Sequence, residues 1–168
     1  MQEDIVEYIH LPAGSTLPLT SSHPRRTMVL IEEAVDQDWR DRVSEWIIAS
    51  GCLYMMAWGE DCSLWDDSVD YAMLQKYGFG DIPDNEFVMT TWHSQDSLAE
   101  VFFFARACAS HPTIELPYLT IIDVRNESRE AAIRALHHVE AQGLLDDVLA
   151  DPRDLPLRER LKILFKVS

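Results

Sequence analysis

The sequence predicts an α/β protein: a three-layer sandwich, Rossmann-like or flavodoxin-like, around a central and mostly parallel sheet of four to five strands. Three observations predict this class. Short, continuous apolar runs recur along the chain, as is typical of strands buried on both faces of a sheet. Stretches of roughly 10–15 residues with helical apolar spacing separate these runs. The chain has 168 residues and is 47% hydrophobic, which is enough for one such domain.

The apolar runs place four strands at residues 28–32, 52–57, 87–91 and 118–124. Because helical segments separate them, we expect parallel βαβ units with right-handed crossovers. Helix signals lie in each interval, where a capping residue precedes an apolar face and a glycine follows it. We expect Asp36 and Gly51 to bound the first helix and Gly78 to end the second. We expect Ser94 or Ser97 to cap the third, and Asn126 or Ser128 to start a fourth that Gly143 ends.

The domain organisation follows from these elements. Residues 1–26 are expected to form an N-terminal arm or an edge strand, which could pair antiparallel with the sheet. Residues 27–143 form the α/β domain. Residues 144–168 are expected to be a C-terminal docking segment of the same domain, because bases outnumber acids from Asp151 onward while the chain as a whole is acidic.

The charge of the chain limits its partners. With 14 basic and 29 acidic residues the formal net charge is −15, which argues against nucleic acid and anionic membranes and favours a basic protein partner. The three cysteines have no metal-binding spacing, the first residues lack a signal-peptide core, and no apolar run reaches the ~20 residues of a membrane span. We therefore expect a cytoplasmic protein without a cofactor.

The candidate site lies where the expected strands end, because ligands of open parallel sheets bind beyond the carboxyl ends of the strands. Tryptophan stands beside carboxylates there, although indole rings usually lie in cores or interfaces. Between Gly59 and Ser97 there are nine acids and one base, Lys76. The residues that we expect to form a binding rim are Glu32, Trp58, Asp61, Trp65, Asp66, Asp67, Trp92 and His93.

The rim supports two functional interpretations. The first is a protein- or peptide-binding module, regulatory or immunity-like, in which the tryptophans are anchors and the acids attract a partner rich in Arg and Lys. The alternative is a metal-dependent hydrolase or phosphoryl-transfer enzyme that uses Glu32, Asp61, His93 and Asp123 as ligands. These positions partly resemble a Toprim domain, but Arg125 replaces the second Asp of that family. The simplest interpretation is structural: Asp66 and Asp67 would cap the second helix.

Other chemistries lack the residues they need. Cys62 and His93 could form a thiol and base pair, yet the surrounding acids disfavour a thiolate. No glycine-rich phosphate loop is present. We therefore assign no catalytic residue and no metal ligand, and favour a protein that is not an enzyme. The apolar helix around Phe102–Phe104 would allow a homo-oligomer.

Two sequence blocks, GCLYMMAWGEDCSLWDDSVD and EFVMTTWHSQDSLAEVFFFARACASHP, resemble those of an uncharacterised family of bacterial α/β proteins. The shared features are GCLYMMAWG-x-DC-x-x-WDDSVD and VMTTWH. The resemblance covers roughly residues 27–125. It implies a bacterial, cytosolic α/β domain and assigns no function to the rim.

Overall fold

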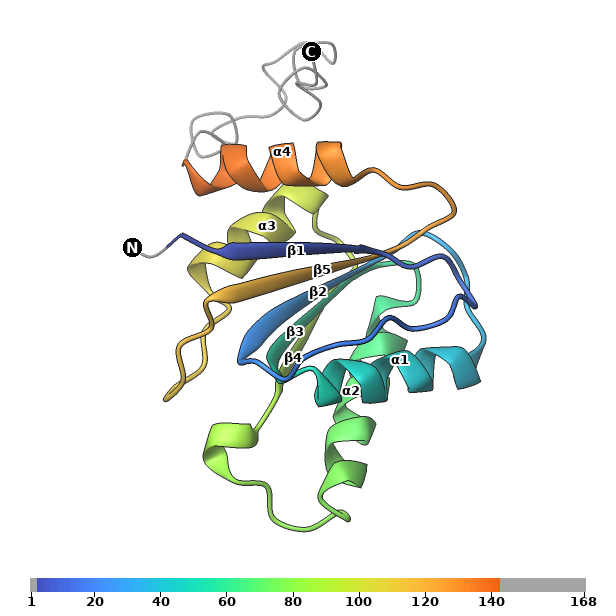
Figure 1. Cartoon of the computed structure of the whole chain (residues 1–168), viewed down its shortest axis with the longest axis vertical. Helices are drawn as coiled ribbons and strands as arrows, with labels where there is room; N and C mark the ends of the chain where they lie inside the picture. Colours follow the sequence, from blue (N-terminus) through green and yellow to red (C-terminus); the bar gives the residue numbers. More distant parts are fainter. Residues whose placement is uncertain (1–2, 143–168) are drawn as a thin grey trace. The chain divides into compact units, whose positions relative to one another are not determined.

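A computed structural model describes residues 3–142 (Figure 1). The expected C-terminal docking segment, 144–168, and the helix-ending Gly143 lie outside the described residues. The chain divides into two compact units. Among the described residues, the first runs to Gln95 and includes Ala109–Ser128, and the second contains Asp96–Cys108 and residues 129–142. The whole sheet belongs to the first unit, so the strand ends that make up the candidate site can be described within one unit.

The sheet has five strands, all parallel, in the order β1-β5-β2-β3-β4. Their bounds are Ile5–His10, Arg25–Ile31, Cys52–Gly59, Met89–His93 and Tyr118–Val124 for β1 to β5. Together with the four α-helices of residues 3–142, this sheet confirms the expected α/β class, in a layout consistent with a Rossmann- or flavodoxin-like sandwich.

The N-terminal segment forms the edge strand β1, but it pairs parallel with β5 and not antiparallel. The reason is the connection that follows. Residues 11–24 contain no helix or strand and return the chain to the starting end of the sheet before β2 begins (Figure 1). A two-residue hairpin would have reversed the direction of the chain, whereas the long return lets β2 run in the same direction as β1.

Two helices, α1 (Gln37–Ala49) and α2 (Cys62–Lys76), pack against each other and against one face of the sheet (Figure 1). As expected, Asp36 is the N-cap residue of α1, and Gly51 follows its end at a φ of 85°. The core on this face consists of Val29 and Ile31 of β2, Met55 and Ala57 of β3, Ile122 and Val124 of β5, and Trp39, Val43, Ile47, Trp65, Val69 and Met73 of the helices.

α2 begins before Asp66 and Asp67, the two residues expected to cap it in the structural interpretation. Gly59 has a φ of 103°, the next turn places Asp61 in the left-handed region at 52°, and the helix starts at Cys62. Asp66 and Asp67 therefore lie in the second turn of α2 and do not cap it. A Cβ at Gly59 would lie 2.1 Å from the carbonyl oxygen of Ile31, so only glycine allows this close turn.

The second unit contains α3 (Leu98–Ala107) and α4 (Glu130–Ala141), which contact each other. Ser97 and Glu100 form a complete capping box at the start of α3, as one of the two expected caps. The N-cap residue of α4 is Arg129, not Asn126 or Ser128. Glu140 is buried and accepts a hydrogen bond from Arg106 Nε at 2.7 Å, which joins the two helices.

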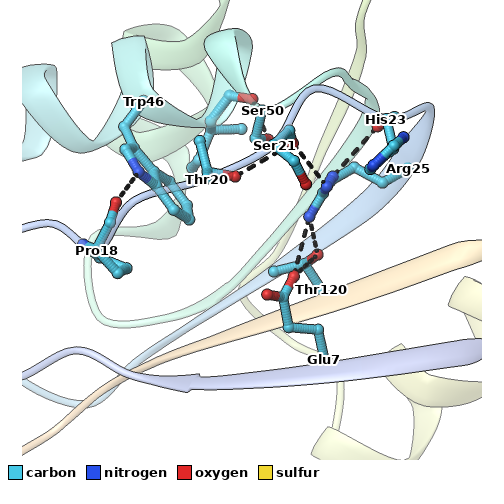
Figure 2. Close-up of polar contacts among 10 residues, drawn as sticks. Glu7, Pro18, Thr20, Ser21, His23, Arg25, Trp46, Ser50 and Thr120 are labelled. Atoms are coloured by element: carbon cyan, nitrogen blue, oxygen red, sulfur yellow. Dashed lines mark hydrogen bonds and ion pairs between the residues drawn. The ribbon is translucent and has the colours of Figure 1, made fainter.

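Arg25 holds the long connection before β2 in place (Figure 2). Its side chain is 4% exposed, and its guanidinium donates to the carbonyl oxygens of His23 (3.2 Å) and Ser21 (2.9 Å). The same group donates to Glu7 and Thr120, both at 2.9 Å. One buried cation therefore joins the connection to β1 and β5 at the starting end of the sheet.

Candidate functional site

A row of five residues crosses the carboxyl end of the sheet. The strand register aligns His10 of β1, Asp123 of β5, Leu30 of β2, Trp58 of β3 and His93 of β4. Register partners in a sheet point to the same face. That face is opposite the one covered by α1 and α2, because the neighbours of Leu30, Val29 and Ile31, belong to the core on the helix side.

The polar groups of this row bond to residues around it. The buried Asp123 carboxylate accepts a hydrogen bond from the Tyr8 hydroxyl at 2.7 Å. His10 Nε2 lies 2.9 Å from the carbonyl oxygen of Arg125, and the Arg125 guanidinium pairs with Glu32 at 3.1 Å. Each group thus has a partner inside the protein, so the row is well suited to joining the strand ends.

The expected rim residues fall into separate places. Trp58 and His93 are neighbours in the row, as a shared rim requires. Trp92 points to the opposite face of β4 because it adjoins His93 in the strand. Trp65 lies in the core with no exposed surface, edge to face with Trp39 at 6.2 Å between ring centroids, so it does not reach the surface. Asp61 is exposed in the turn before α2.

A second group, which we call the α2–β4 edge surface, consists of Asp66, Asp67 and Asp70 of α2 with Thr90 and Trp92 of β4. Asp66 and Asp70 are one helical turn apart and share a face of α2. The Thr90 hydroxyl donates to Asp70 at 2.8 Å, which places this face of the helix beside β4. Trp92 shares its strand face with Thr90 and is 55% exposed.

Two carboxylates of this surface, Asp66 and Asp70, have raised pKa values. Burial raises the pKa of Asp66, and the neighbouring charges of Asp70 and Asp67 raise it further. Burial also raises the pKa of Asp70, although the Thr90 hydrogen bond acts in the opposite direction. Asp66 is 6% exposed, and its Oδ1 has no hydrogen-bond partner among the described residues. Most buried polar atoms are paired, so this oxygen is an exception.

Thr90 and Asp70 were not among the expected rim residues, although both patterns are visible in the sequence. Asp66 and Asp70 have the i, i+4 spacing that aligns side chains on a helix. Thr90 and Trp92 have the i, i+2 spacing that aligns them on a strand. What the sequence does not supply is the pairing of these two faces, because it depends on how α2 packs against β4.

The residues considered for metal or thiol chemistry do not gather. Within residues 3–142 no group of three or more His, Cys, Asp or Glu side chains is arranged to hold a metal ion. Glu32 is paired with Arg125, and Cys62 is buried. Burial also raises the pKa of the Cys52 thiol to about 11. No helix in the described part of the chain is long and apolar enough to cross a membrane.

The fold defines an α/β domain with an all-parallel sheet, and no cluster that could hold a metal ion is found among the described residues. Comparison with protein families identifies it further. The chain belongs to the family described as a domain of unknown function, DUF7684, whose model matches residues 6–140. Comparison with curated proteins and with solved structures found no match.

Proposed function

We propose that this protein is a binding module for a basic protein or peptide and that the α2–β4 edge surface is its contact site. The observation that carries the proposal is the position of Trp92. This side chain is 55% exposed, and it shares its strand face with Thr90, which donates a hydrogen bond to the Asp70 carboxylate of α2. Tryptophan is enriched at interfaces and is a common energetic anchor of them.

Charge supports the same function. The chain carries a net charge of −15, and the segment from Gly59 to Ser97 contributes nine acids against one base. A field of this sign attracts a partner rich in Arg and Lys and accelerates their encounter. A regulatory or immunity-like protein, which masks the basic surface of its partner, would use the charge in this way.

The metal-dependent hydrolase is the weaker alternative. Its expected ligands are Glu32, Asp61, His93 and Asp123, and these do not form a group that could hold a metal ion. Moreover, Arg125 already neutralises Glu32 at 3.1 Å. Thermal melts with Mg²⁺, Mn²⁺, Zn²⁺ and EDTA test this alternative, since a bound ion stabilises only the folded state. A saturable shift with one cation that Asp61→Asn abolishes would support it.

The binding function is tested with a fluorescently labelled basic peptide, followed by anisotropy at increasing salt. We expect binding that weakens as salt rises, because exposed charges are screened, and that ignores EDTA. Trp92→Ala should weaken binding by tenfold or more. Phe79→Ala, which removes a 59% exposed aromatic ring beyond the end of α2, is the matched control and should have little effect. Equal losses in both variants would contradict the proposed site.

A further inference from the structure

β4 is an edge strand without the usual protection. In the described part of the chain it pairs only with β3, so its other side presents main-chain N–H and C=O groups. Proteins usually protect such edges with charged residues, proline or bulges. The opposite edge, β1, carries Glu7 and is preceded by Glu3 and Asp4. The sequence of β4, MTTWH, has neither an acidic residue, a lysine nor a proline.

Apolar side chains flank this edge on both faces. Met89 is 40% exposed and Trp92 is 55% exposed, and they lie on opposite faces of β4 because their positions differ by an odd number. Between them, Thr90 and Thr91 are half-buried β-branched residues that favour strand geometry. An unprotected, apolar strand edge is a template for pairing with another chain.

The carboxylate pair beside this edge has the charge and the unpaired oxygen that suit a cationic ligand. Asp66 is more than nine-tenths buried with Oδ1 unpartnered, and it adjoins Asp70 across one helical turn. With Thr90 as the nearest hydroxyl, the described residues provide two carboxylates and no third metal ligand. An ammonium or guanidinium group fits such a pair better than a metal ion, because it supplies several N–H donors of its own.

We propose that the α2–β4 edge surface binds an extended, basic segment of a partner protein as an additional strand beside β4, with a Lys or Arg side chain at Asp66 and Asp70. This inference rests on the proposed function and adds the mode of recognition. Main-chain hydrogen bonds to β4 provide affinity, and the carboxylate pair selects a basic residue beside Thr90. Two residues along the segment, an apolar or Arg side chain packs on Trp92.

The dimensions of the surface define a probe. β4 has five residues, and a strand rises about 3.3 Å per residue, so a peptide of about seven residues covers it. The peptide acetyl-Lys-Thr-Arg-Thr-Val-Thr-Lys-amide places its basic and apolar side chains on one face and threonines on the other. Two N-methylated versions block alternate main-chain N–H groups, one on each edge of the peptide, and leave all charges unchanged.

The three peptides are compared by anisotropy with the full-length protein. We expect one N-methylated peptide to bind at least tenfold more weakly than the parent, and the other within threefold of it, because only one edge faces β4. If both bind as the parent does, strand addition is wrong while the binding function stands. If no peptide binds, and a basic protein such as lysozyme does not bind either, the proposed function itself is wrong.

A double-mutant cycle tests the carboxylate pair. Asp66→Asn and Asp70→Asn should each lower the affinity for the parent peptide by tenfold or more. Asp84→Asn, which neutralises an exposed acid outside this surface, should change binding less than threefold. Replacing the peptide Arg by citrulline should remove most of the effect of Asp66→Asn. Equal effects of Asp66→Asn on the Arg and citrulline peptides would overturn the assignment of the basic side chain to this pair.

Discussion

The Arg25 network allows a stability prediction whose size can be worked from the structure. Arg25→Met keeps much of the aliphatic stem and removes a guanidinium that bonds to His23, Ser21, Glu7 and Thr120. Residues 21–24 and Glu7 are exposed, so water can replace the cation at most of these partners. The buried Thr120 hydroxyl already has Glu7 within 3.1 Å. The loss is therefore smaller than that of a fully buried ion pair.

Counting about 1 kcal/mol for each bond to an exposed partner, we expect Arg25→Met to lower the free energy of unfolding by about 3 kcal/mol. In a chain of 168 residues this corresponds to a fall in Tm of about 6–12 °C. Arg25→Lys keeps the charge and loses the planar fork, so its loss should be smaller.

Urea unfolding followed by circular dichroism measures both variants. The matched control is Arg42→Met, which removes an exposed arginine of α1 and should change stability by less than about 0.5 kcal/mol. If the free energy of unfolding of Arg25→Met lies within 1 kcal/mol of the wild-type value, the contacts of Arg25 drawn in Figure 2 do not hold the connection before β2 in place.

Three further predictions concern side chains that the structure places in contrasting environments. Trp65→Ala should lower stability by about 3–5 kcal/mol and Trp92→Ala by less than about 0.5 kcal/mol, by urea unfolding; similar losses would contradict their assignment to core and surface. Because the pKa of Asp66 is raised in the folded state, its stabilising contribution is present at low pH and lost as pH rises through that raised value. Asp66→Asn should therefore be more stable than wild type at pH 7, by about 0.5 kcal/mol, with the difference shrinking toward pH 3; a difference that grows on acidification would contradict this. At pH 8 iodoacetamide should alkylate the exposed Cys108, whereas Cys52, whose pKa is raised to about 11, should react only after unfolding, as mass spectrometry can show; equal rates would refute the placement.

The sequence predicts the fold better than the site because burial leaves a clear pattern. The apolar run at 118–124 matches β5, and the run at 52–57 is extended only by Trp58 and Gly59. The expected strand at 87–91 is instead Met89–His93. Val88 is apolar because it packs against Met73 in the core, although strand pairing begins one residue later. An apolar pattern reports burial and does not report where a ladder starts.

For the candidate site, the sequence predicts which residues follow the carboxyl ends of the strands, and it does not predict which of them share a face. The fold rule predicts that Glu32, Trp58 and His93 lie together, and the strand register pairs Trp58 with His93. The fold rule does not distinguish the two faces of a strand. Trp92 and His93 are adjacent in β4, so their side chains lie on opposite faces. Trp65 also belongs to the core, because α2 starts at Cys62 and turns this ring inward.

The central claim, that the α2–β4 edge surface binds a basic partner, is tested most directly by mapping where a basic peptide binds. The measurement is a titration of ¹⁵N-labelled protein with the Lys-Thr-Arg-Thr-Val-Thr-Lys peptide, followed by amide chemical shifts at low salt. We expect the largest saturable changes on Thr90–Trp92 and on Asp66–Asp70. Changes centred instead on His10, Glu32 and Arg125, or spread evenly over the acidic surface, would contradict it.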